Sequence, residues 1–76
     1  MKIRVELTFP SQLKDEPIIF YLCRDYNIIL NILEASFSTD TGWVILILEG
    51  KDEELKRAFD YMKGKGVRFE ALKEIT

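Results

Sequence analysis

A strict alternation of apolar and polar side chains at the start of the chain is the feature that most restricts its fold. Residues 2–9 read Lys-Ile-Arg-Val-Glu-Leu-Thr-Phe, so every second side chain is apolar. This period of two predicts a β-strand with one face in a core and the other in water. A chain of 76 residues has room for one such core. We therefore expect one sheet that is covered on a single face.

The segment after this strand predicts a short helix. Two prolines and several polar residues precede it, and we expect it to run from about Pro17 to Tyr26 and to stop at Asn27. Cys23 lies close to its apolar stripe and is expected to be a small buried side chain. Spacings of three and four residues define the stripe itself: Ile18, Ile19, Leu22 and Tyr26.

A second helix is predicted after Asp52, which we expect to cap it, and glycines at 64 and 66 end it. Its expected core face consists of four apolar residues: Leu55, Ala58, Phe59 and Met62.

Three further strands complete the predicted order β-α-β-β-α-β. Residues 28–38 and Trp43–Glu49 form a hairpin around the turn at 39–42, and residues 67–71 form the last strand before a tail at 73–76. This order predicts a single α+β domain over residues 1–76 with a ferredoxin-like βαββαβ fold. The expected sheet is antiparallel with strand order 4-1-3-2, and both helices cover one face.

The hairpin is apolar on both of its faces. Alternation predicts one face with Leu33, Ala35, Phe37, Val44, Leu46 and Leu48, and the other with Ile28, Leu30, Ile32, Trp43, Ile45 and Ile47. Whichever set meets the helices, an apolar half-sheet remains on the open side. We expect a second copy of the chain to cover it, unless the long turn or the tail does so. The predicted interface residues are Leu30, Ile32, Trp43, Ile45 and Ile47.

Composition argues against several classes of function. The net charge is −2, so nucleic acid is not an expected partner, and one cysteine with no histidine cannot build a disulfide, a zinc site or an iron–sulfur cluster. The first strand does not read as a signal peptide, and no apolar run is long enough to cross a membrane. We expect a cytoplasmic chain with no cofactor, no metal and no catalytic residue.

Asn31 is the one polar side chain in an otherwise aliphatic stretch at 28–33. A held amide needs hydrogen-bond partners, and two interpretations supply them. In the first, Asn31 closes a bulge or caps the preceding helix, which is the more common use of such a residue. In the second, it binds the charged groups of a zwitterion.

Several segments, in their order and spacing, resemble the NIL domain. This ferredoxin-like module is related to ACT-type regulatory domains and is best known at the carboxyl end of the ATPase subunit of bacterial methionine importers. The segments that carry the resemblance are Leu7-Thr8-Phe9, Glu16-Pro17-Ile18, Asn31-Ile32-Leu33-Glu34-Ala35, Gly42, Leu48-Glu49-Gly50 and Gly66-Val67.

The resemblance implies an amino-acid sensor. In that family, copies pair through their sheets, methionine binds near the dimer interface, and its binding inhibits transport. By this resemblance Asn31 anchors the ligand's α-amino or α-carboxylate group, while Ile32 and Leu33 form the adjoining wall. The chain has no phosphate-binding Gly-x-x-x-x-Gly-Lys-Ser/Thr loop, so it is not itself the ATPase and stands alone or is part of a longer protein.

Two hypotheses remain open. In the first, the chain senses L-methionine or a related sulfur amino acid as a homodimer. In the second, it is a ligand-free interaction module whose apolar half-sheet docks a transporter ATPase or an iron–sulfur enzyme component.

Overall fold

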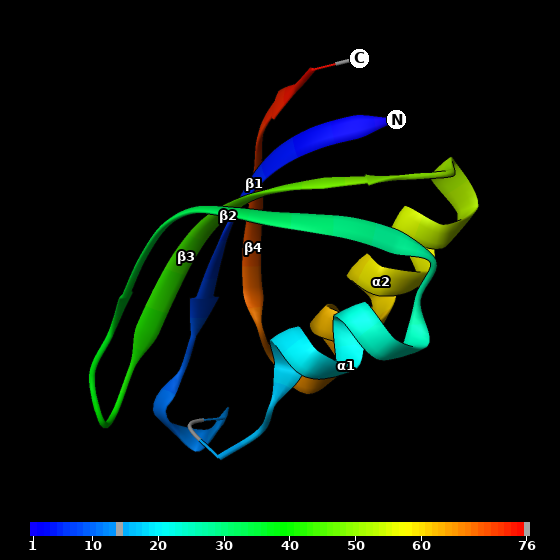
Figure 1. Ribbon diagram of the computed structural model, residues 1–76. Coiled ribbons are helices and arrows are strands. Elements are labelled where there is room, and N and C mark those ends of the chain that lie inside the picture. The colour runs from blue at the N-terminus through cyan, green and yellow to red at the C-terminus, as the bar shows by residue number, and fades with distance from the viewer. Residues whose placement is uncertain (14, 76) are drawn as a thin grey trace.

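The structure is a computed structural model that describes residues 1–13 and 15–75. The elements, in chain order, are β1 (Lys2–Phe9), a short 3₁₀ helix η1 (Ser11–Leu13), α1 (Ile18–Asp25), β2 (Ile28–Phe37), β3 (Gly42–Gly50), α2 (Asp52–Lys65) and β4 (Arg68–Glu74). The strands form one antiparallel sheet in the order β2-β3-β1-β4, which is the predicted order counted from the other edge. Both helices lie on the same side of this sheet (Figure 1). The predicted ferredoxin-like α+β fold is confirmed.

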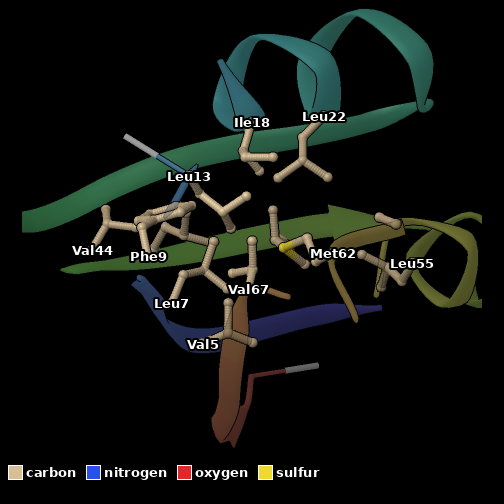
Figure 2. Close-up of a cluster of buried hydrophobic side chains, with 13 residues drawn as sticks. Val5, Leu7, Phe9, Leu13, Ile18, Leu22, Val44, Leu55, Met62 and Val67 are labelled. Atoms are coloured by element: carbon tan, nitrogen blue, oxygen red, sulfur yellow. The ribbon is translucent and has the colours of Figure 1, made fainter. Parts of the chain in front are cut away.

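The core lies between the two helices and the sheet. Figure 2 shows Ile18 and Leu22 of α1 directed at the strands, with Met62 and Leu55 of α2 beside them. Their side chains are at most 2% exposed, because both apolar stripes close on the same face of the sheet. The remaining buried residues are Val5, Leu7, Phe9, Leu13, Val44, Leu46, Leu48, Ala58 and Val67.

Two predictions about the helices are wrong in detail. Cys23 is exposed because it follows Leu22 on α1 and so points away from the core-facing stripe. Asp52 is the first residue of α2 rather than its cap, and Lys51 precedes it without a capping side chain. The carboxylate of Asp52 still lies in the first turn, where the helix dipole favours negative charge. At the other end, Gly66 takes φ +88° and ends α2 as predicted.

A bulge in β2 changes the predicted alternation of the hairpin. Leu30 lies opposite Leu48 and Ile32 opposite Leu46, but the next paired residue, Glu34, lies opposite Ile45. Leu33 is therefore an extra residue, and the side chains before and after it cannot follow one uninterrupted alternation. Strict alternation places Leu33, Ala35 and Phe37 on one face and Ile28, Leu30 and Ile32 on the other, and the bulge makes this division wrong. Up to Ile32, its residues on the helix side are Ile28, Leu30 and Ile32, and beyond the bulge they are Ala35 and Phe37.

A second bulge lengthens β4. Val5 lies opposite Ala71 and Arg4 opposite Lys73, so Leu72 is the extra residue. The strand continues to Glu74, and the Ile75 N–H donates to the Lys2 carbonyl at 2.8 Å. The tail expected from residue 73 is therefore mostly strand, and as far as Ile75 it extends the sheet beside β1 instead of folding over β3. Thr76 lies outside the described residues. In the part of the chain that the structure covers, neither helix is long and apolar enough to span a membrane.

Candidate ligand-binding site

The face of the sheet away from the helices is half charged and half apolar. Register places Lys2 opposite Glu49, Arg4 opposite Ile47, Glu6 opposite Ile45 and Thr8 opposite Trp43. On the other side of β3, Ile29 lies opposite Glu49 and Asn31 opposite Ile47. Residues that face one another across an antiparallel pair share one side of the sheet. We call Ile29, Trp43, Ile45 and Ile47 the open-face patch; the first is 66% exposed and the other three are half-buried.

A cavity of about 390 Å³ lies at one end of this open face. It falls within the range of pockets that hold small ligands. Three aliphatic residues line it together with one amide and two opposite charges: its residues are Lys2, Ile29, Leu30, Asn31, Ile47 and Glu49.

Asn31 meets this cavity from β2 with an exposed side chain. It lies in regular register opposite Ile47, two residues before the bulge at Leu33, and α1 ends earlier, at Asp25, with Tyr26 as its C-cap. Asn31 therefore neither closes the bulge nor caps α1. Within the described residues its amide makes no hydrogen bond, so both its donors and its acceptor are available to a ligand.

The two charges in the cavity face each other on neighbouring strands. Lys2 Nζ lies 3.9 Å from a Glu49 carboxylate oxygen, and the two side chains are 41% and 47% exposed. This separation exceeds the donor–acceptor distance of a hydrogen bond, which is roughly 2.7–3.2 Å. The pair is an open, water-exposed contact whose groups retain most of their hydrogen-bonding capacity.

The sequence-predicted site residues fall into three places. Asn31 lines the cavity, Ile32 lies on the helix side of β2 with 49% exposure, and Leu33 is the bulged residue with 45% exposure. The structure thus does not bring Ile32 beside the Asn31 side chain, because neighbouring strand residues point to opposite faces. Of the five predicted interface residues, Trp43, Ile45 and Ile47 share the open face. Leu30 and Ile32 instead register with the buried side chains of β3.

Sequence reasoning missed Lys2, Glu49 and Ile29. Their charges and hydrophobicity are ordinary for strand residues. Only the register, which pairs the start of β1 with the end of β3 and the start of β2, brings them together. A usable signal was the single apolar-to-acidic change at Glu49 on the otherwise apolar open side of β3.

A larger cavity of about 650 Å³ lies between the β1–α1 loop and the turn of the hairpin. Phe9, Phe20 and Phe37 line it, and the charged side chains among its described lining residues are all carboxylates: Asp15, Glu16 and Asp40. Among the described residues, the smaller cavity presents both a cation and an anion, which are the two charges that a zwitterion requires. No group of three or more histidine, cysteine or acidic side chains able to hold a metal occurs among residues 1–13 and 15–75.

A four-stranded antiparallel sheet with two helices on one face defines a ferredoxin-like domain. The candidate site is the small cavity on its open face. The NIL domain family model matches residues 3–71, and the chain therefore belongs to the NIL domain family. The predicted resemblance is confirmed.

Two relatives are ATP-binding proteins of methionine import. The chain is 34% identical over 74 residues to methionine import ATP-binding protein MetN 2 of Oenococcus oeni, covering 92% of this chain and 21% of that protein. It is 25% identical over 75 residues to MetN of Bacillus subtilis, covering 93% and 22%. The chain thus spans about a fifth of the length of these relatives.

Solved structures support the fold. The C-terminal domain of an ABC transporter ATP-binding protein from Enterococcus faecalis superposes with a TM-score of 0.80 at 18% identity, covering 95% of this chain and 84% of that one. The de novo designed protein Ferredog-Diesel superposes with a TM-score of 0.56 at 15% identity, covering 96% and 85%. At these identities the likeness concerns the fold alone.

Proposed function

We propose that the chain is a regulatory amino-acid-binding domain that senses L-methionine, or a related sulfur amino acid, at a homodimer interface. The observation that carries this proposal is the cavity that Asn31 lines together with a lysine, a glutamate and aliphatic residues. An α-amino acid with an apolar side chain presents the same combination of groups. The relatives whose names include methionine import support methionine as the ligand class.

The open-face patch supports pairing with a second copy. Two of its residues, Ile29 and Ile47, also line the cavity. Burial of a fully exposed side chain of this size gains about 1.5–3 kcal/mol, and the half-buried members of the patch gain a part of that. A partner placed over the patch would also close the cavity and desolvate the ligand. Because a two-fold axis makes such an interface self-complementary, one apolar patch is sufficient for both copies.

The relatives also suggest where and how the domain acts. Both are ATP-binding proteins, so we place the domain in the cytoplasm, where ATP is available. Binding of the amino acid would report its internal concentration to a transporter ATPase, as part of the same protein or as a partner.

Thermal unfolding with and without millimolar L-methionine tests the proposal. Ligand at 100 times its Kd adds about 2.7 kcal/mol per site, and each kcal/mol raises the Tm of a domain this small by roughly 4–8 °C. We expect a shift that is selective for methionine over homocysteine, cysteine and leucine. Asn31→Ala should remove the shift while leaving the dimer intact, whereas the matched change Asn27→Ala, outside the cavity, should leave it unchanged. A normal shift in Asn31→Ala would exclude the anchor role.

The second candidate is a ligand-free module that docks a transporter ATPase or an iron–sulfur enzyme component through the open-face patch. The exposure of Ile29, at 66%, favours some covering partner. No thermal shift with any amino acid, together with a monomeric chain at tens of micromolar, would make this candidate the better one. Under it, Asn31→Ala changes only stability or partner affinity.

A further inference from the structure

The facing charges of Lys2 and Glu49 have no strong role in holding the fold together. Their closest approach of 3.9 Å is too long for a hydrogen bond, and each side chain is nearly half exposed. Ion pairs of this kind contribute little to stability. The sheet is already fixed in this region by the backbone, since Ile3 pairs with Leu48 in the next register position.

The pair nevertheless lies on the same face of the sheet as Asn31, at the next position of that face along β3. Glu49 lies on β3 two residues beyond Ile47, and Ile47 faces Asn31. Residues in such a diagonal relation on one face are within reach of long side chains. A cation, an anion and an amide with both a donor and an acceptor thus line one cavity from three adjacent strands.

Building on the proposed function, we infer that Lys2 and Glu49 distinguish a zwitterion from singly charged ligands: Lys2 binds the α-carboxylate and Glu49 binds the α-ammonium. The two charged groups of an α-amino acid are attached to one carbon atom, so they match opposite charges on directly opposed residues. Charge-assisted hydrogen bonds to both groups are short and strong. Asn31 then completes the hydrogen bonding of either group.

The aliphatic residues give the ligand side chain its direction. With the charged groups held at Lys2 and Glu49, a side chain can lie over Ile47 and continue along β3 towards Ile45. Trp43 lies four residues from Ile47, about 13 Å along the strand. It is too distant to contact the same ligand, which leaves it free for the interface.

The test compares three probes by calorimetry on the purified chain. These are L-methionine, the acid that lacks the α-amino group, and methioninol, in which an alcohol replaces the carboxylate. We expect the wild type to bind methionine at least tenfold more tightly than either analogue. Glu49→Gln should remove the preference over the acid and keep that over methioninol. Lys2→Gln should do the reverse.

Charge-matched controls are available on the same open face. Glu70 lies opposite Glu6 and Arg68 lies opposite Thr8, both outside the cavity. The control variants are Glu70→Gln and Arg68→Gln. They should leave all three affinities unchanged. If methionine binds the wild type but Lys2→Gln and Glu49→Gln lower the three affinities equally, or leave them unaltered, the assignment is wrong while the proposed function stands. If the wild type binds no methionine, the proposed function itself fails and the assignment fails with it.

Discussion

β1 and β3 lie side by side at the centre of the sheet, and their open faces have opposite character. On the helix side both are closed: Val5, Leu7, Val44 and Leu46 are all 0% exposed. On the open side β1 carries Lys2, Arg4, Glu6 and Thr8, whereas β3 carries Trp43, Ile45 and Ile47 before its final Glu49. An antiparallel sheet needs only one apolar face to form a core. The second apolar face of β3 is therefore surplus to the fold of one chain.

This surplus is what a binding face requires. A water-exposed isoleucine adds little to the stability of the fold until a ligand or a partner covers it. The charged side chains of the neighbouring strand keep the rest of this face soluble. The cavity with Asn31 lies where the two kinds of surface meet, since Lys2 belongs to β1 and Ile47 to β3. The difference between the strands thus separates residues that hold the fold from residues available for function.

The largest expected effect comes from the covered side of β3. Leu46→Ala should lower the free energy of unfolding by about 2–5 kcal/mol, because it leaves a cavity in a core that cannot collapse fully. The matched change Ile45→Ala, one residue away on the open face, should have a much smaller effect in the monomer. Urea unfolding at a concentration below any self-association measures both. Equal losses would mean that the two faces of β3 are not different after all.

A charge on the open side should affect association rather than folding. Ile45 lies between Glu6 on β1 and Glu34 on β2, so Ile45→Lys gains an opposite charge on each neighbouring strand. We expect the variant to remain folded and to dissociate any dimer, because the lysine would be buried at the interface. Sedimentation velocity and circular dichroism on the same samples check both points. A variant that stays dimeric would place the interface elsewhere.

The elements could be predicted from the sequence, because their signals are local. β1 begins and ends where the alternation does. α2 stops before Gly66, because a glycine adopts the positive φ of this C-cap without steric cost. Strict alternation did not reveal the bulges at Leu33 and Leu72, because each follows another apolar residue, Ile32 or Ala71, and only the pairing with the neighbouring strand decides which of the two is the extra one. Because the bulge at Leu33 was not predicted, Ile32 was expected on the open side of β2, whereas it lies on the helix side. The proximity of Lys2 and Glu49 depends on register between distant segments, which no local pattern encodes.

The smallest expected effect concerns the attachment of the helices to the covered face. The Glu54 carboxylate of α2 accepts the backbone N–H of Asn27 at 2.9 Å, next to the start of β2, and also binds Arg57. Both hydrogen bonds lower the pKa of Glu54 below its usual 4.5, and the one from Asn27 has the larger effect. A carboxylate whose pKa is lower in the folded state stabilises the fold above the unfolded pKa, and the contribution disappears as the pH falls through the folded pKa.

Glu54→Gln removes this dependence on pH. The wild type should therefore have the higher Tm at neutral pH, and the difference should shrink steadily below about pH 4.5, the usual pKa of the group. Tm measured from neutral to acidic pH tests this, with Glu53→Gln as the control because Glu53 lies in the same first turn of α2. Parallel curves for wild type and Glu54→Gln would show that the contact does not hold the helix layer in place. A loss of ligand binding without a change in Tm would instead connect the covered face to the open one, and so weaken the separation drawn between the two sides of the sheet.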